Sequence, residues 1–325
     1  MRLKLVPAGT TLDFFRFTPI TFGFSALAAV ASVVLFFTFG LNFGIDFRGG
    51  SMLLTETPEE VPISEYRDAL SVLDVGDISV TEISDPAAEL TGAAQFSAMI
   101  RVEQQGDDPA IQNDTVQLVQ STLEEAIPGL TVLATESVGA KVSGELITAA
   151  LIALTLAIAV VLFYIWLRFE WQFSVGAVAA LVHDVVLTIG VFSLIGLEFN
   201  LAIVAAILTI VGYSLNDTVV VFDRVRENLK RYKKKELKEV LNQSINETLS
   251  RTVMTSVTTL IALISLYILG GEVIRGFTFA MIWGVIVGTY SSVFVASAIL
   301  LRLDVKRDWS KPEGGPGTQF SNVDA

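Results

Sequence analysis

Long apolar runs divide the chain into six candidate membrane spans. A helix crosses the ~30 Å hydrocarbon core of a bilayer in about 20 residues, and runs of this length with no charge, or with a single one, recur along the sequence. The first run is longer than the roughly 7–15-residue apolar core of a cleaved signal peptide, so we expect it to be a retained span. The six candidate spans lie within residues 17–45, 146–167, 171–197, 199–216, 252–271 and 276–301, and the fourth extends through 218–222 if Asp217 is tolerated inside the membrane.

The segment between the first two spans changes from long apolar runs to short alternating ones. Some apolar residues alternate with polar ones, as in half-buried strands, and others recur three or four positions apart, as on one face of a helix. The predicted elements are strand 51–57, helix 63–73, strands 78–83 and 96–102, helix 116–127 and a strand from residue 130. This βαββαβ order is the ferredoxin-like split. The predicted fold class is therefore an α-helical integral membrane protein with six transmembrane helices and an α+β ferredoxin-like domain between helices 1 and 2.

Composition agrees with a membrane protein that carries one soluble domain. Hydrophobic residues make up 52% of the chain and charged residues 17%, below the ~25% of soluble domains. Residues 42–141 hold 18 Asp and Glu against 4 Lys and Arg. The chain has no Cys and a single His, His183, so we expect no disulfide, thiol chemistry, cofactor or metal site. The net charge of −12 argues against nucleic acid as a partner.

Lys and Arg concentrate on one side of the predicted membrane. With the N-terminus inside, the inner segments hold 17 of the 22 basic residues and the outer segments hold 5. The positive-inside rule then places both termini in the cytoplasm and the acidic domain outside. The predicted domains are a cytoplasmic N-terminus (1–16), a first transmembrane helix (17–41), an outer domain (42–145), helices two to six (146–301) and a cytoplasmic tail (302–325).

Most of the inner basic residues lie in the predicted loop 222–251, between spans four and five. We interpret this loop as a determinant of topology that rests on anionic membrane lipid. Docking of a ribosome or of a translocation partner is the alternative interpretation.

Two acidic residues, Asp184 and Asp217, lie inside predicted spans three and four. An Asp at the centre of a span costs about 2.5–3.5 kcal/mol to insert, so it needs a partner or a water-filled cavity and is a functional candidate. Ser214 shares a helix face with Asp217, and Arg251 begins span five at a similar depth, so we expect an Asp217–Arg251 ion pair. This pair is either a static contact or a proton site whose affinity changes when the Arg moves.

Further polar residues are candidates to support such a relay. A row of Thr residues continues along one face of span five, where it can hold a chain of water. His183 adjoins Asp184 in mid-span, and a lone His there is commonly a hydrogen-bonded packing residue. The supporting candidates are Asp184, Ser214, Asn216 and Thr255. Span six carries a ridge of small residues that predicts close helix packing: Gly284, Gly288, Ser292 and Ala296.

Several motifs together resemble the SecD/SecF family of protein-export membrane proteins. The run Gly44-Ile45-Asp46-Phe47-Arg48-Gly49-Gly50 directly after span one is similar to a motif of SecD and SecF proteins, as are Ser137–Gly139 and Gly144–Leu146 before span two. Gly212–Thr218 and Val221–Asn228 resemble the family's fourth span, and Asn246 with Ser250–Thr252 resembles the start of the fifth. The resemblance covers residues 17–301.

The resemblance implies a function in protein export. SecD and SecF pair into a twelve-span unit that is similar to resistance–nodulation–division transporters and uses the proton-motive force to pull preproteins outward. The family's essential acid and arginine fall on Asp217 and Arg251. The implied partners are SecD as a separate polypeptide, the SecYEG channel, YajC, YidC, the SecA motor and preprotein substrates. The implied location is the bacterial inner membrane with a periplasmic domain at 42–145, and no hydrolytic active site is implied.

Three other functions fit parts of the pattern. Half of a lipid or drug exporter also has six spans, but such exporters usually carry larger outer domains. An intramembrane aspartyl protease also places two Asp on neighbouring spans, but the Gly-x-Gly-Asp pattern is absent before Asp217, and Arg251 would hold that carboxylate ionised. A passive assembly scaffold needs no titrating residue. The sequence allows either a proton or sodium as the coupling ion, because carboxylate and hydroxyl oxygens can bind both.

Overall fold

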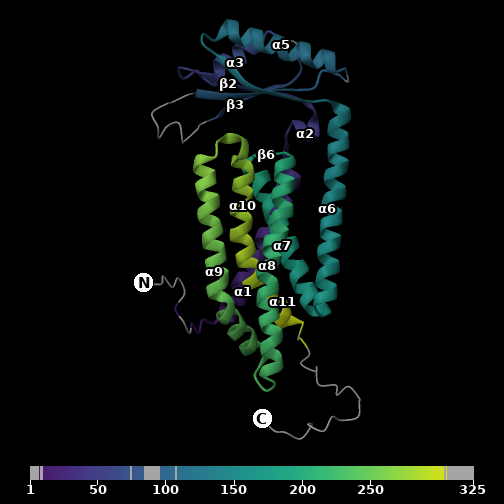
Figure 1. Cartoon of the computed structure of the whole chain (residues 1–325), viewed down its shortest axis with the longest axis vertical. Coiled ribbons are helices and arrows are strands. Elements are labelled where there is room, and N and C mark those ends of the chain that lie inside the picture. The colour runs from purple at the N-terminus through teal and green to yellow at the C-terminus, as the bar shows by residue number, and fades with distance from the viewer. Residues whose placement is uncertain are drawn as a thin grey trace.

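Six long helices form a bundle with a small α+β domain at one end (Figure 1). The computed structural model describes residue 7 and residues 10–73, 75–83, 96–106, 108–303 and 305. Part of the predicted N-terminus and most of the predicted tail lie outside these residues. Within them, six helical segments are long and apolar enough to cross a membrane. They are α1 (Thr18–Phe39), preceded by η1 (Phe14–Phe17), α6 (Ala140–Arg168), α7 (Trp171–Ile195), α8 (Leu201–Arg231), α9 (Leu237–Leu269), and α10 (Glu272–Ser291) continued by η2 (Ser292–Ala296) and α11 (Ser297–Arg302).

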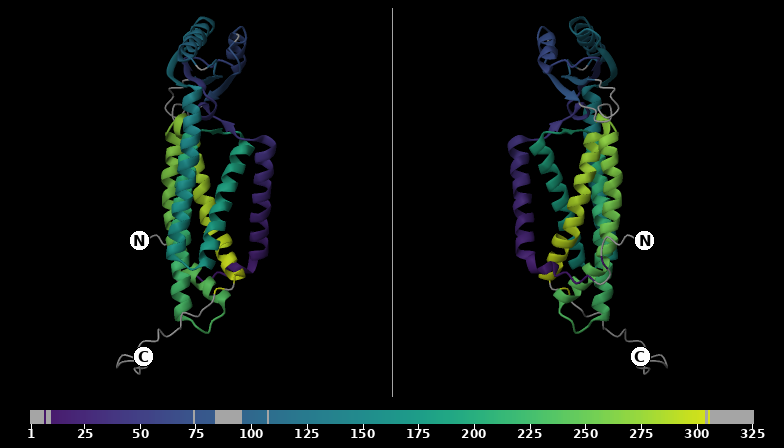
Figure 2. Two further views of the ribbon diagram at one scale, coloured as in Figure 1. Left: turned by 90° about the vertical axis from the view of Figure 1, so that its right-hand side faces the viewer. Right: turned by 90° about the vertical axis from the view of Figure 1, so that its left-hand side faces the viewer.

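The helices α8 and α10 occupy the centre of the bundle, and α6 stands at its edge. None of the residues in the most apolar part of α6 is buried, whereas half of those in α8 and two-thirds of those in α10 and its continuation are. In Figure 1, α6 and α9 lie at opposite edges, and Figure 2 shows α1 beside α7 on a third side. Burial therefore concentrates where α7, α8 and α10 meet.

The small residues of span six let α10 approach α8 closely. A Cβ atom on Gly284 would lie 2.2 Å from the Ile210 side chain, and one on Gly288 would lie 3.1 Å from Ser214. Both neighbours belong to α8. The ridge therefore serves the predicted close packing, and the contact is made within this chain.

The α+β domain has the predicted order of elements. Its strands form one antiparallel sheet in the order β3-β4-β2-β5, so β4 separates the two strands of a β-α-β unit and splits it. Both helices cover the sheet face turned away from the bundle (Figure 1), and the core between them includes Leu53, Tyr66, Ile100 and Leu123. The elements are β2 (Gly50–Thr57), α3 (Ile63–Leu70), β3 (Ile78–Ile83), β4 (Phe96–Val102), α5 (Pro109–Ala126) and β5 (Thr131–Val138).

The predicted loop 222–251 is mostly helical. The helix α8 continues to Arg231 and α9 begins at Leu237, so only residues 232–236 lie outside a helix. The uncharged runs of the fourth and fifth spans are shorter than α8 and α9. Both helices continue into the predicted loop as amphipathic extensions that keep their basic residues on the more exposed side. Buried apolar residues continue the helical spacing and pack the two extensions together: Val225, Leu229, Val240, Leu241 and Ile245.

A pair of two-residue strands joins the two parts of the molecule. The strand β1 (Asn42–Phe43), directly after α1, pairs in parallel with β6 (Glu198–Phe199), which lies in the connection from α7 to α8. The short helix α2 (Ile45–Arg48) follows β1 and leads into β2. We call β1, α2 and β6 the joint. Strands of two residues leave no periodic signal in a sequence, so the hydrophobic pattern does not predict this pairing.

Candidate functional site

Two buried carboxylates lie where α7, α8 and α10 meet. Asp184 on α7 is 1% exposed, and Asp217 on α8 is 6% exposed. Because water is scarce at this depth, each carboxylate depends on polar groups of neighbouring helices. The hydroxyls that reach them belong to Ser214 on α8, Thr252 on α9, and Ser291 and Ser292 where α10 passes into η2.

Asp184 has the larger set of partners. Its Oδ2 accepts hydrogen bonds from the Ser214 hydroxyl at 2.6 Å and from the Ser291 hydroxyl at 2.7 Å. Its Oδ1 lies 3.0 Å from Nδ1 of His183. The spacing of three residues predicts that Ser214 lies on the same face of α8 as Asp217. The Ser214 hydroxyl instead points to the neighbouring helix α7 and binds Asp184.

Asp217 is held by hydroxyls and not by the expected ion pair with Arg251. The Thr252 hydroxyl donates to Oδ1 at 2.7 Å, and the Ser292 hydroxyl donates to Oδ2 at 3.4 Å. Arg251 is exposed, and no ion pair joins it to Asp217 in the described ranges. Successive residues of a helix point about 100° apart, so the rotation that turns Thr252 toward Asp217 turns Arg251 away. The expected ion pair is therefore wrong for this conformation.

Ser291 and Ser292 each bind one of the two carboxylates. They are consecutive, yet the first donates to Asp184 and the second to Asp217. They lie where α10 changes into the π-helical segment η2, and such π-bulges are frequent at functional sites. Sequence reasoning assigned Ser292 to the packing ridge and did not single out Ser291. A pair of adjacent serines in an apolar span was the signal that was available.

Polar contacts continue from Asp184 toward α1. The ring of His183 stacks on Tyr290, with 6.2 Å between the ring centroids. The Tyr290 hydroxyl donates to the carbonyl of Thr21 at 2.8 Å and lies 3.0 Å from the Ser25 hydroxyl. Nε2 of His183 is buried without a hydrogen-bond partner among the described residues. The imidazole therefore keeps one nitrogen free while the other faces Asp184.

Two of the predicted supporting residues do not reach the carboxylates. Asn216 is exposed, because it lies about 100° around α8 from its buried neighbour Asp217. The Thr255 hydroxyl donates to two backbone carbonyls of its own helix, and the Thr258 hydroxyl does the same one turn further on. The structure therefore brings Asp184 and Ser214 into the site, but not Asn216 or Thr255.

The motif at residues 44–50 forms much of the joint. Asp46 Oδ2 accepts a hydrogen bond from the backbone N–H of Leu201 at 2.9 Å. It thus helps to satisfy the first turn of α8, the helix that carries Asp217. Phe47 packs with Phe43 and Phe199 in an aromatic cluster.

Close approaches and positive φ angles favour the glycines of the motif. A Cβ atom on Gly44 would lie 2.3 Å from the Glu198 carboxylate, so that side chain would have to shift. Gly50 has a φ of 114°, and a Cβ atom there would lie 2.4 Å from the backbone carbonyl of Val102. Gly49 also has a positive φ, of 74°, which favours glycine. The motif is therefore explained by the geometry of the joint.

An ion pair ties the sheet of the domain to the joint. Arg101 on β4 binds Glu198 on β6, and both side chains are partly buried. Burial raises the pKa of the Glu198 carboxyl above its ordinary value; Arg101 opposes this shift, and the nearby Asp46 adds to it. Both members of the pair line a cavity of about 790 Å³ between the sheet and the bundle. The domain thus contacts the start of α8 through Asp46 and through this pair.

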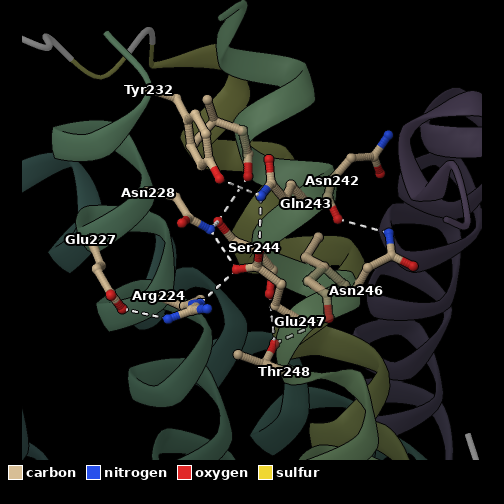
Figure 3. A network of polar contacts seen from close by, with 12 residues as sticks. Arg224, Glu227, Asn228, Tyr232, Asn242, Gln243, Ser244, Asn246, Glu247 and Thr248 are labelled. Atoms are coloured by element: carbon tan, nitrogen blue, oxygen red, sulfur yellow. Dashed lines mark hydrogen bonds and ion pairs between the residues drawn. The ribbon is translucent and has the colours of Figure 1, made fainter. Parts of the chain in front are cut away.

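A charged network joins α8 and α9 at the end of the bundle opposite the domain (Figure 3). Glu247 accepts hydrogen bonds from Arg224 at 2.6 Å, and from Asn228 and Gln243 at 2.8 Å each. Arg224 also binds Glu227 at 2.6 Å. The network fixes the two helical extensions to each other.

The chemistry of the buried site is that of two separate carboxylates. No hydrogen bond joins Asp184 to Asp217 in the described part of the chain, and each binds its own set of hydroxyls. The shared proton of an aspartyl protease needs two carboxylates in contact. Among the described residues, no group of three His, Asp or Glu side chains is arranged to hold a metal ion.

The fold and the site define a class of protein: a multi-pass membrane protein with six spans, hydroxyl-bound carboxylates at its centre, and a βαββαβ domain joined to the fourth span. Residues 118–306 match the family described as "Protein export membrane protein SecD/SecF, C-terminal", and residues 34–57 match the "SecD/SecF GG Motif". The chain belongs to the SecD/SecF family of protein export membrane proteins.

Similar proteins match along the whole chain. The SecF protein translocase subunit of Cereibacter sphaeroides is 53% identical over 100% of this chain and 99% of its own length, and that of Rhodobacter capsulatus is 51% identical over 98% and 96%. The SecDF protein translocase subunit of Brucella abortus is 42% identical over 94% of this chain and 39% of its own length. The crystal structure of SecDF from Thermus thermophilus, a translocon-associated membrane protein, superposes with a TM-score of 0.79 at 34% identity, covering 91% of this chain and 39% of that one. The predicted family and six-span fold are confirmed.

Proposed function

We propose that this chain, in complex with SecD, uses the proton-motive force to drive the late stage of preprotein export across the inner membrane. The SecDF relatives support the partnership, because this chain matches 39% of their length and a second polypeptide would supply the SecD part. The observation that carries the proposal is the environment of Asp217, a carboxylate buried in the bundle whose bonded partners are neutral hydroxyls.

Asp217 is suited to bind and release a proton. The hydroxyls of Thr252 and Ser292 can donate to an ionised carboxylate and accept from a protonated one, so both charge states keep their partners. Arg251 precedes Thr252, and a rotation of α9 would exchange the hydroxyl for the guanidinium. Protonated Asp217 on Thr252 and ionised Asp217 on Arg251 are then alternative states of one site, and a proton from the membrane gradient selects between them.

Asp184 and the two serines extend this site toward α7. Ser292 donates to Asp217, and its neighbour in the chain, Ser291, donates to Asp184. Nδ1 of His183 faces Asp184, where it can donate a hydrogen bond to the carboxylate. We assign Asp217 and Arg251 the central role and Asp184, Ser291 and Ser292 a supporting one.

The joint transmits the change at Asp217 to the domain. Asp217 and the capped first turn at Leu201 belong to one continuous helix, so a displacement of α8 moves both. Asp46 binds that turn and leads directly into β2. The domain then alternates between two positions, in which it holds or releases the emerging chain.

The remaining assignments follow the family resemblance and the distribution of charge. The domain faces the periplasm and both termini face the cytoplasm. The basic residues of 222–251 rest on anionic lipid. The complex acts with SecYEG, YajC and YidC on preproteins that SecA has moved, and it has no hydrolytic active site of its own.

The test is export by inner-membrane vesicles that carry the Asp217→Asn chain at matched levels of the SecD–SecF complex. Asn keeps the size and an acceptor oxygen but cannot ionise. We expect the part of export that depends on the proton gradient to be lost, while the gradient-independent part remains. Asp223→Asn is the matched control, because Asp223 lies on the same helix but pairs with Arg168 in a half-exposed position.

Persistence of the gradient-dependent part in an assembled Asp217→Asn complex would overturn the proposal. Repeating the measurement in sodium-free buffer, with a proton ionophore, identifies the coupling ion. If the ionophore abolishes gradient-dependent export in sodium-free buffer, the coupling ion is the proton. If export instead requires sodium, the same carboxylate is a sodium site and the proton relay is rejected.

A further inference from the structure

A groove lies between α6 and the central helices, in the half of the bundle nearer the domain. Its volume is about 370 Å³, within the range of small-molecule sites. Apolar side chains of α6, α7 and α8 form its walls, and the aromatic cluster of the joint, with Phe47 and Phe199, closes the end toward the domain. No residue in the most apolar part of α6 is buried. The groove is therefore an apolar recess that faces the membrane.

The groove has the depth of one membrane leaflet. Its deepest lining residues are Leu154, Val185 and Ile207. They lie 8–12 residues from the domain-side ends of their apolar spans, at 146, 197 and 199. At 1.5 Å per residue this places the floor roughly 12–18 Å inside the hydrocarbon region, and half of a ~30 Å core is about 15 Å.

The positive charge of Arg48 at the end of the groove favours an anionic occupant. Arg48 lies at the domain end, at the level of the joint, and is the charged residue among those that line the groove. Its guanidinium is exposed and makes no hydrogen bond or ion pair with another residue of the described ranges. An Arg at the end of an apolar wall places its charge at headgroup level, where it can bind a phosphate through two parallel hydrogen bonds.

A flexible acyl chain matches the apolar walls of the groove and the depth of one leaflet. An apolar helix of a partner subunit is the other candidate occupant, and the experiment below distinguishes the two.

We propose that this groove binds an anionic phospholipid of the domain-side leaflet, with an acyl chain between α6 and α8 and its phosphate on Arg48. The lipid would pack under Phe47 and Phe199, and so against the elements that cap α8. This site is separate from the basic residues at the opposite end of the bundle.

The experiment uses the full chain in complex with SecD, reconstituted in nanodiscs of phosphatidylcholine and phosphatidylglycerol. Native mass spectrometry after transfer to detergent counts the lipids retained by each complex. Leu151→Trp fills the groove, whereas Ile152→Trp adds the same ring to the next position, which is similarly exposed and does not line it. Arg48→Gln removes the charge, and Arg67→Gln on α3 is its control.

We expect Leu151→Trp to lose one retained lipid per complex and Ile152→Trp to lose none. Arg48→Gln should reduce the preference for phosphatidylglycerol over phosphatidylcholine by about fivefold, the factor that one basic residue supplies at an anionic surface, and Arg67→Gln should leave the preference unchanged. Equal lipid retention in both Trp variants, or an unchanged preference in Arg48→Gln, would overturn the proposal. Loss of SecD from the Leu151→Trp complex alone would also overturn it, because the groove would then be a subunit contact.

Discussion

Two polar regions of the helix bundle differ in what surrounds their carboxylates. At the end opposite the domain, Glu247 is partly exposed and binds the guanidinium of Arg224 and two amides. In the middle of the bundle, Asp184 and Asp217 are buried and bind mainly hydroxyls. A guanidinium favours the ionised form alone, whereas a hydroxyl can serve both protonation states. The first region is built as a fixed clamp between α8 and α9, and the second allows a change of charge.

The largest effect on stability is expected at Asp184. Asp184→Leu removes the acceptor of two serine hydroxyls and the partner of His183, and each buried polar group left unsatisfied costs about 1–3 kcal/mol. Because Ser291 can also bind a carbonyl of its own helix, we expect a loss of about 2–4 kcal/mol in the free energy of unfolding in detergent. Asp184→Asn keeps an acceptor and should lose about 1 kcal/mol. Equal stability of the Leu variant and the unmodified chain would show that the hydroxyl network does not hold the bundle together.

The next effect concerns the packing that brings these hydroxyls to the carboxylates. Gly284→Ala places a methyl group against Ile210, and overpacking of this kind typically costs about 1–3 kcal/mol. Gly212→Ala on α8 is the matched control, because no atom lies within 4 Å of the added Cβ. Thermal unfolding of both variants should show a lower midpoint for Gly284→Ala alone. Similar midpoints would mean that α10 can move away from α8 at little cost.

A smaller effect is expected in the charged network. Glu247→Gln removes the charge that faces Arg224 but keeps an oxygen for the amides, and partly exposed pairs contribute about 1 kcal/mol or less. Glu227→Gln, which alters the more exposed partner of the same Arg, should change stability by less than about 0.5 kcal/mol. We expect both variants to export normally. A loss of gradient-dependent export in Glu247→Gln, with stability maintained, would contradict the division into a clamp and a site that changes charge.

The fold was accessible from the sequence because its signals are long. Six apolar runs with at most one charge each, and the alternating segment 42–145, predict the spans and the domain order that the structure has. The site was accessible in part, because an Asp inside a span stands out through its cost. The partners of Asp217 were not accessible from the sequence. The rotation of α9 decides whether Arg251 or Thr252 faces Asp217, and this rotation depends on packing against α8 and α10. Ser291 and Ser292 form an adjacent pair in the sequence, but the π-helical segment that begins at Ser292 leaves no sequence pattern. The joint rests on strands of two residues.

Glu198 is intermediate between the two regions, because it has a guanidinium partner and is also partly buried. Burial raises the pKa of Glu198 above its ordinary value of 4.5, Arg101 offsets only part of the shift, and Asp46 adds to it. A pKa raised in the folded state means that folding strengthens proton binding. The resulting stabilisation is complete below pH 4.5 and is lost as the pH rises through the raised value.

Glu198→Gln tests whether burial or ion pairing controls this carboxyl. Gln cannot titrate, so the variant should lose the decline in unfolding temperature that the unmodified chain shows as the pH rises from 4.5 toward neutrality. The change in stability should be smaller than those expected at Asp184, Gly284 and Glu247. About a quarter of the Glu198 side chain is exposed, and solvent screens its charge. If the stability of the unmodified chain instead increases with pH over this window, and the increase disappears in Glu198→Gln, pairing with Arg101 outweighs burial. Glu198 would then belong with Glu247 as a fixed clamp, and the joint would not respond to the acidity of the side that the domain faces.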